Sequence, residues 1–494
     1  MDRRLAENTE EIRFRVDATR CDGQGVCAIV APEIFELDRY GLAYVVPGSE
    51  RAVSDDGELR ARGLEADAMC PRDAIREEPV RRRPVLPAPD VALASSGPAR
   101  RLLGAHGDGP EPLDRWRRAG GFGAHPGPDV LAAVEAAGLL GHGGAGYPAA
   151  AKWQRLGGST DPVVVMNGAE REPGTLKDRH LLSTRPALVL DGLRLAMAAV
   201  GARLGVAAFD EESVTEHDAF TAVVAEASAR GLLGDVEIRT HKVPTAYIAG
   251  EETALLSVIE GGRPLPRLRP PFPSDRGVWG RPTLVQNVET LAQVALVMAL
   301  GVAEFRGQGT AEAPGTGLFS VGPFGGPYHV VECAYGTSLR ELLAGEGLLD
   351  GARAVLVGGY AGGLLAPDQF DTPLLPATLV EAGAALGTKA VQVVGAERCP
   401  VGVAAEIVGY FGAETADQCP PCSRGLPDMA QLLRDIEAGT GGGAAVAELG
   451  TFMGTLTGRG VCGLPDGAAR VVLSVLTRFA DEIEQHTVSG CPQR

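Results

Sequence analysis

The sequence predicts a multidomain α/β protein with four folded units: a small α+β unit, a large α/β domain, a small β-rich domain and a C-terminal helical bundle. Three observations predict this. The chain has 494 residues, more than one hydrophobic core usually supports. Its hydrophobic fraction of 45% and charged fraction of 22% are ordinary for globular proteins. In its middle part, short buried-strand patterns alternate with apolar helical segments, which is typical of a mostly parallel sheet.

The first unit is expected over residues 10–78. The segment IRFRVD alternates in polarity like a strand, and a second strand, LAYVV, follows a turn at Gly41. Residues 79–100 are rich in Pro, Ala and Ser and have neither a helical nor a strand period. They are therefore expected to form a fairly stiff linker.

The large α/β domain is expected over residues 101–312. Its expected elements are a helix over 128–140 that Pro128 opens, a buried strand over 162–166, a long apolar helix over 186–203, and strands over 205–209 and 236–243.

The β-rich domain is expected over residues 313–388. It is expected to contain two strands joined by a Gly/Pro turn, a helix with Thr337 or Ser338 as its N-cap, and a further strand in ARAVLVGGY. Residues 389–490 are expected to form the helical domain.

The charge and hydropathy of the chain exclude two classes of partner. A formal net charge of −17 argues against broad nucleic-acid binding, which needs a basic surface. Polar residues such as Asp191 and Arg194 interrupt the apolar stretches early, so no membrane-spanning helix is expected. The first residues contain no apolar signal region. We therefore expect a cytoplasmic protein.

The nine cysteines carry the first functional signal. In a cytoplasmic protein, grouped cysteines indicate metal or redox chemistry rather than disulfides. One group contains Cys21, Cys27 and Cys70, and the other contains Cys419, Cys422 and Cys462. The other three, which are expected to be small buried side chains or stray surface thiols, are Cys333, Cys399 and Cys491.

The N-terminal group has the spacing of an iron–sulfur ligand set. Closely spaced cysteines with a distant Cys-Pro bind such clusters, and glycines provide the tight turns. Gln24 stands where a cubane cluster would need a thiolate, so three thiolates suit a 3Fe–4S cluster. A zinc site and unrelated cysteines are the alternatives.

Residues 10–78, with CDGQGVC and MCPRDAI, closely resemble the single-cluster 3Fe–4S ferredoxins of bacteria. The resemblance implies a ferredoxin-like fold. It also implies redox partner proteins such as a haem monooxygenase or other subunits.

A glycine-rich segment, GHGGAGYPAAAKW, begins at Gly141. The preceding residues are expected to be helical, whereas a dinucleotide-binding loop follows a strand. The segment is therefore not expected to be an ordinary Rossmann loop. Its backbone N–H groups could still hold a phosphate, and Lys152 could add charge.

This loop and the blocks at 166–179, 246–273 and 279–290 together resemble the NADH-binding flavoprotein subunit of complex I and its hydrogenase and formate dehydrogenase relatives. The resemblance covers roughly residues 105–490. It implies an FMN- and NADH-binding domain, a β-grasp domain of the SLBB type and a helical iron–sulfur domain.

The family's site residues can be carried over position by position. The glycine-rich loop and Lys152 would hold the FMN phosphate, four polar residues would line the flavin, and Glu172, Tyr147 and Phe272 would face the nicotinamide nucleotide. None is assigned a catalytic role. The cofactor-binding set is Gly141, Gly143, Gly144, Gly146, Tyr147, Lys152, Asn167, Glu170, Glu172, Gly250, Glu251, Glu252, Arg269, Phe272 and Asn287, in which Asn167, Glu170, Glu251 and Asn287 line the flavin.

The sequence departs from the family at several of these places. Ala169 and Arg171 replace residues of its acidic flavin-facing motif, Arg269 replaces a Lys, and Arg155 replaces an aromatic side chain. Because Arg grips phosphates with two hydrogen bonds, we hypothesise that Arg155 binds the 2′-phosphate of NADPH. The alternative is a solvated Arg155, and the choice between NADH and NADPH stays open.

The C-terminal cysteine group also departs from the family, which binds a 4Fe–4S cluster with four cysteines. Ala416 replaces the first of them, and Cys419, Cys422 and Cys462 remain. A non-Cys ligand such as Asp417 or water could complete the cluster, the site could hold 3Fe–4S, or it could be empty. A dithiol redox pair is a weaker alternative.

The sequence therefore predicts an NAD(P)H dehydrogenase-like flavin oxidoreductase fused to its own ferredoxin. Electrons would run from NAD(P)H to FMN, to the C-terminal cluster, to the N-terminal centre and out. The alternative is a non-enzymatic electron-bridging subunit of a larger complex, with a degraded flavin site.

Overall fold

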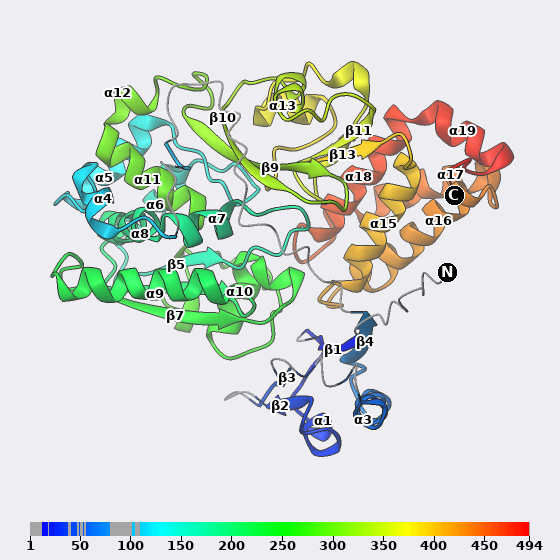
Figure 1. Ribbon diagram of the computed structural model, residues 1–494, viewed down its shortest axis with the longest axis horizontal. Helices are drawn as coiled ribbons and strands as arrows, with labels where there is room; N and C mark the ends of the chain where they lie inside the picture. The colour runs from blue at the N-terminus through cyan, green and yellow to red at the C-terminus, as the bar shows by residue number, and fades with distance from the viewer. Residues whose placement is uncertain are drawn as a thin grey trace, which may run out of the picture.

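The computed structural model describes residues 12–17, 19–37, 41–46, 49, 53, 56–79, 101–103 and 109–493. Figure 1 shows these residues as a small N-terminal unit beside a larger body in which the remaining domains adjoin. The predicted linker lies, apart from Pro79, outside the described residues.

The N-terminal unit has two small antiparallel sheets and two helices. Strand β1 (Ile12–Val16) pairs with β4 (Ile75–Pro79), and β2 (Phe35–Leu37) pairs with β3 (Ala43–Val45). Helix α1 (Val26–Val30) follows the first two cysteines, and α3 (Gly57–Ala68) begins at Asp56, whose side chain accepts hydrogen bonds from two backbone amides. Both strands expected from the sequence are present.

The large domain contains a four-stranded parallel sheet in the order β7-β6-β5-β8. Its strands are β5 (Val163–Gly168), β6 (Leu204–Asp210), β7 (Glu237–Val243) and β8 (Thr283–Asn287). Its α-helices are α4 (Leu113–Arg118), α5 (Gly127–Ala137), α6 (Ala149–Gln154), α7 (Lys177–Thr184), α8 (Pro186–Val200), α9 (Val214–Ala229), α10 (Glu252–Ile259), α11 (Val288–Leu300) and α12 (Val302–Phe305).

Helices cover both faces of this sheet, which is why β5 is apolar at successive positions rather than alternate ones. Val164 and Met166 pack in the core with α8 and α11, whereas Val163 and Val165 pack in a second core with α10. The structure therefore confirms the expected parallel sheet. The carboxyl ends of β5 and β8 lead into the predicted flavin residues.

The β-rich domain has five strands in the order β10-β9-β13-β11-β12. These are β9 (Thr316–Pro323), β10 (His329–Ala334), β11 (Ala352–Val357), β12 (Gly363–Leu365) and β13 (Ala390–Gly395), with α13 (Leu339–Gly345) and α14 (Pro376–Glu381). Ser338, rather than Thr337, caps α13, since its side chain forms a capping box with Glu341.

The sequence-based boundary at residue 388 falls before β13, which pairs with β9 and β11. We therefore place the end of this domain at Gly395. A short apolar run does not reveal which distant strands it joins.

The remaining helices are α15 (Pro400–Ala413), α16 (Leu426–Ala438), α17 (Gly442–Leu456), α18 (Leu464–Arg478) and α19 (Ala480–Ser489), with a π-helical turn at Pro421–Gly425. They share a core with the β-grasp sheet through residues such as Leu356 and Val394. None of the described helices is long and apolar enough to cross a membrane.

The N-terminal unit contacts the turn that follows α15. Arg15 pairs with Glu414, the Thr19 hydroxyl donates to the carbonyl of Thr415 at 3.4 Å, and Arg20 lies 3.8 Å from Asp417. Figure 1 shows β1 and β4 on the side of this unit that faces the helical and large domains. These contacts bring the two cysteine-bearing segments together.

Candidate functional site

The glycine-rich loop connects α5 to α6, as the sequence predicts. It is closed at its base by hydrogen bonds of 2.9 Å from the Gly141 amide to the Tyr147 carbonyl and from the Ala149 amide to the Leu139 carbonyl. Gly144 and Gly146 have φ angles of 116° and 62°, and a Cβ at either would meet nothing within 4 Å. The loop is therefore a backbone cradle beside open space, which fits a phosphate group.

Asn287 lies against this cradle. A Cβ on Gly143 would come within 3.3 Å of the Asn287 Cβ. The Asn287 side chain caps α11 by accepting from the amides of Glu289 and Thr290, and it donates to Asp178 over 2.6 Å. The loop and the end of β8 thus enclose one site.

Three further predicted flavin residues have local structural partners. Asn167 donates to the Gly250 carbonyl at 2.8 Å and so joins the end of β5 to the segment before α10. Glu170 accepts from the first amides of α7, and burial raises its pKa to about 7. Glu251 caps α10. Each of these side chains positions backbone around the cradle.

Opposite charges gather beside the loop. Lys152 lies 2.8 Å from Glu252, and Arg269 lies 2.5 Å from Glu251 and 3.1 Å from Glu252. Arg171 faces elsewhere, toward Asp210 at 3.1 Å. The two cations near the loop are thus held by carboxylates, and an anionic ligand would compete with Glu251 and Glu252 for them.

Arg155 lies between two exposed aromatic rings. Its guanidinium carbon is 5.8 Å from the centre of the Tyr147 ring and 5.4 Å from that of Phe272. The rings are 45% and 40% exposed, which is unusual for large apolar side chains in the absence of a ligand. The structure brings both predicted nucleotide-facing aromatics to one place, with Arg155 as a cation–π partner.

Glu172 connects the nucleotide side of the domain to the β-grasp sheet. It accepts from the Tyr247 hydroxyl at 2.7 Å and from the Tyr360 amide at 2.5 Å. Burial raises its pKa to about 7. Its placement beside Gly359 of the next domain was not expected from the sequence.

Sequence reasoning missed a buried charge network beneath the cradle. Lys389 pairs with Glu289 and lies 2.7 Å from the Nδ1 atom of His142, which belongs to the glycine-rich loop. Lys177 lies 2.8 Å from Asp178 and 3.3 Å from Glu289. One available signal was composition, because Lys177 and Lys389 are two of only four lysines in the chain.

The network fixes the charge states of its members. Burial alone would raise the pKa of Glu289, but Lys389, His142 and Lys177 lower it to about 2. Burial lowers the pKa of Lys389 to about 8 and that of His142 to about 3. Near neutral pH Glu289 is therefore ionised and His142 is neutral, so the loop is held by a charged pair from two domains.

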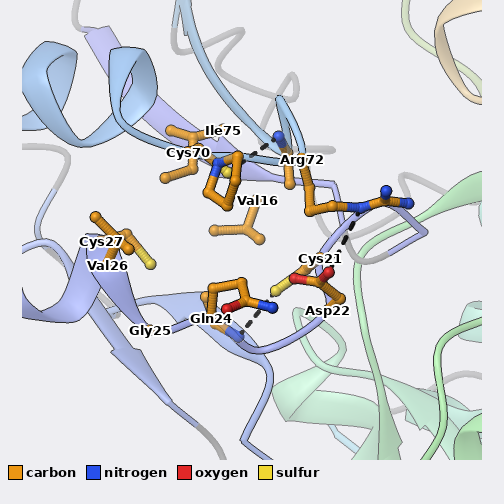
Figure 2. A pocket seen from close by; sticks show the side chains of 13 residues that line it. Val16, Cys21, Asp22, Gln24, Gly25, Val26, Cys27, Cys70, Arg72 and Ile75 are labelled. Carbon is orange, nitrogen blue, oxygen red and sulfur yellow. Dashed lines mark hydrogen bonds and ion pairs between the residues drawn. The ribbon is translucent and has the colours of Figure 1, made fainter.

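The N-terminal cysteines surround one pocket. Figure 2 shows Cys21, Cys27 and Cys70 approaching it from separate segments, with Gln24 at its edge. The amides of Ala43 and Ala74 point at the sulfurs of Cys21 and Cys70, each at 3.4 Å. Backbone N–H groups directed at sulfur are what an iron–sulfur cluster requires.

Gly23 makes this arrangement possible. Its φ is 78°, and a Cβ there would lie 2.6 Å from the Gly41 carbonyl oxygen. The turn between the first two cysteines therefore needs glycine. The three thiols, with the exposed Gln24, fit a cluster that takes three protein ligands.

The C-terminal cysteines lie at helix ends. Cys422 is buried in the π-helical turn before α16, and Cys462 lies shortly before α18. Burial raises the pKa of the Cys422 thiol to about 12 and that of Cys462 to about 11, and Glu251 also raises the latter. The sulfur site is thus electrostatically coupled to the flavin side. Asp417, the candidate fourth ligand, is exposed and faces Arg20.

Three family models match successive parts of the chain. They describe a 4Fe–4S single cluster domain over residues 14–76, the Nuo51 FMN-binding domain over 134–296, and the NADH-ubiquinone oxidoreductase-F iron–sulfur binding region over 402–486.

Individual relatives agree with these models. The NADH-quinone oxidoreductase F-subunit of Streptomyces coelicolor is 37% identical over 74% of this chain and 84% of its own length. A second such protein, the F-subunit numbered 2 of Rhizobium meliloti, is 33% identical over 76% of this chain and 94% of its own length. An NAD⁺-reducing [NiFe]-hydrogenase chain in its H2-reduced state matches 97% of this chain and 85% of its own, with 25% identity and a TM-score of 0.73.

Proposed function

The chain belongs to the family of NADH-quinone oxidoreductase F-subunits, and from that premise we propose that electrons taken from NADH leave it through a ferredoxin unit of its own. The chain is an NADH dehydrogenase-like oxidoreductase with an FMN-binding domain and iron–sulfur regions. No observation favours the alternative of a non-enzymatic bridging subunit. The role of the N-terminal unit is the new part of the proposal.

FMN, when bound, supplies the ability to accept a hydride and return single electrons. The residues that would hold its phosphate are the glycine-rich loop and Lys152, which must then exchange Glu252 for the ligand. Asn167, Glu170 and Asn287 would hold the backbone around the ring through the hydrogen bonds described above. Tyr147, Phe272 and Glu172 would bind the nicotinamide nucleotide.

The single observation that carries the proposal is the contact between the two cysteine-bearing segments. Thr19 touches Thr415, and these residues precede Cys21 and Cys419 by two and four positions. Arg263 of the large domain also donates to the Thr19 carbonyl at 3.0 Å. The N-terminal unit is thereby docked at the entrance to the C-terminal sulfur site, which favours direct electron transfer between them.

We propose that the N-terminal centre is 3Fe–4S and that its acceptor is another subunit or a haem monooxygenase. Three thiols around one pocket, without a fourth, support the first part. The exposed Gln24 beside this pocket supports the second, because it leaves one side of the centre open toward a partner protein.

The test uses the full chain and a double variant, Cys21→Ser with Cys27→Ser. Both proteins should oxidise NADH with ferricyanide at similar rates, because that acceptor can take electrons at the flavin side. Only the wild type should reduce an added ferredoxin-dependent haem monooxygenase. Equal delivery to the monooxygenase by both proteins would refute the proposed exit. Absence of flavin and of NADH oxidation in the wild type would refute the oxidoreductase function itself.

A further inference from the structure

Two cysteines that the sequence leaves isolated meet at a histidine. Cys399 follows β13 and is the N-cap of α15, His486 lies in α19, and Cys491 lies just beyond the end of α19. Their ligand atoms all lie within 4.8 Å of one another, and no other group of three His, Cys, Asp or Glu side chains meets this condition among the described residues. The prediction that Cys399 and Cys491 stand alone is therefore wrong in three dimensions.

A carboxylate completes the group. The Oε1 atom of Glu482 lies 3.4 Å from the Cys399 sulfur and 3.7 Å from the Nε2 atom of His486. Both ring nitrogens of His486 lie 4.0 Å from the same sulfur. Around a tetrahedral Zn²⁺, with metal–donor distances of about 2.0–2.3 Å, neighbouring donor atoms are about 3.4–3.8 Å apart. The four side chains thus already have nearly that spacing.

The surroundings suit a closed structural site. His486 is completely buried and Cys399 is 6% exposed. Within the described part of the chain, no polar atom lies closer than 3.7 Å to the imidazole nitrogens. A buried imidazole normally has a hydrogen-bond partner at about 2.7–3.2 Å. A metal ion between the four side chains would satisfy it.

Glu482 is held in position from its other side. Its Oε2 atom lies 2.8 Å from Arg353, which leaves Oε1 directed at the group. Such outer partners orient the ligands of metal sites. The backbone amide of Cys491 donates to the Glu437 carbonyl at 2.8 Å, which anchors the third ligand to α16.

We propose that Cys399, Glu482, His486 and Cys491 bind a structural Zn²⁺. Two thiolates and an imidazole are the donor set that this ion prefers, and the carboxylate fills the fourth position. The ion would join the segment after α19 to the junction of β13 and α15. It would thereby fasten the helical domain, which carries Cys419, Cys422 and Cys462, to the β-grasp sheet.

The site is distinct from both groups of candidate iron–sulfur ligands, so its test is independent of the redox function. The full chain is purified, dialysed against a chelator and analysed for zinc by mass spectrometry. About one zinc per chain is expected. In Cys491→Ser, whose altered side chain is only partly buried, zinc retention should fall by about tenfold or more. Cys333→Ser is the matched control and should retain the metal.

Two further measurements keep the outcome unambiguous. Zinc should persist in Cys419→Ser with Cys462→Ser, since the proposed ion does not occupy the C-terminal sulfur site. A strong chelator should lower the melting temperature of the wild type but not that of Cys491→Ser. The proposal is overturned if Cys491→Ser retains zinc, if zinc follows Cys419 and Cys462, or if alkylation mapping finds a Cys399–Cys491 disulfide in the purified chain.

Discussion

The guanidinium of Arg15 donates to the carboxylate of Glu414, with Nη2 and Oε2 2.6 Å apart. The two residues are 399 positions apart in the chain. Glu414 also accepts from the Tyr247 amide at 3.2 Å. One carboxylate therefore joins the N-terminal unit, the large domain and the helical domain.

Replacing Arg15 by Ala should weaken this docking. A hydrogen bond to a charged group contributes about 1.5–3 kcal/mol, so reduction of the N-terminal centre after mixing with NADH should slow by about tenfold. The linker keeps the unit at an effective concentration of roughly mM, which prevents complete loss. Rapid-mixing absorption spectroscopy measures the rate. Arg239→Ala, in an exposed pair with Glu237, is the control, and an unchanged rate in Arg15→Ala would remove the docking contact from the electron path.

Arg155 gives a prediction about nucleotide choice. If its guanidinium binds a 2′-phosphate, Arg155→Phe should shift the ratio of kcat/KM for NADPH and NADH at least about tenfold toward NADH, equivalent to ~1.4 kcal/mol. Arg155→Lys should shift it less, because the charge remains. Steady-state reduction of ferricyanide measures both constants. An unchanged ratio would leave Arg155 as a stacking partner of Tyr147 and Phe272 only.

Gln24 should decide the type of the N-terminal cluster. With the C-terminal site removed by Cys419→Ser and Cys462→Ser, the reconstituted chain should hold about three irons and give a paramagnetic resonance signal when oxidised. Adding Gln24→Cys should raise the iron content to about four and leave a signal only after reduction. Gln24→Ser is the control and should behave like the parent. Four irons in the parent would contradict the 3Fe–4S assignment.

Glu172 should make stability depend on pH. Burial raises its pKa from 4.5 to about 7. A carboxyl group with a raised pKa favours the folded state below its unfolded pKa, and this contribution of up to about 3 kcal/mol is lost as the pH rises toward 7. Thermal unfolding should therefore show wild type most stable relative to Glu172→Gln at pH 5 and least at pH 8. Exposed Glu237→Gln should show no such trend; a parallel course of wild type and Glu172→Gln would rule out this titration.

Lys389→Met tests the buried network beneath the glycine-rich loop. The change leaves Glu289 with only one of its two lysines, and breaking a buried pair costs about 3–5 kcal/mol. We expect a lower melting temperature and reduced FMN content, because His142 of the loop loses its contact with Lys389. Lys242→Met, at an exposed position, should change neither. Normal melting and flavin content in Lys389→Met would show that the network does not support the loop.

Local patterns in the sequence were sufficient for much of this molecule. The apolar residues of β5 predicted a strand covered on both faces, because side chains alternate between the faces of a sheet. The helix before Gly141 excluded an ordinary Rossmann loop, and α5 is present there. Cys21, Cys27 and Cys70 were grouped by spacing, and they line one pocket.

The sequence by itself thus determined the strands, the helices and the cysteine groups, since each depends on residues close in the chain or on a recognisable motif. Tertiary structure alone decided that β13 completes the β-grasp sheet, that Lys389 meets Glu289, and that Cys399 meets His486 and Cys491. The physical reason is that a buried polar side chain is stabilised by whichever partner the packing of distant elements places beside it. Hydrophobic periodicity records only which face of an element is buried, and it carries no information about that partner.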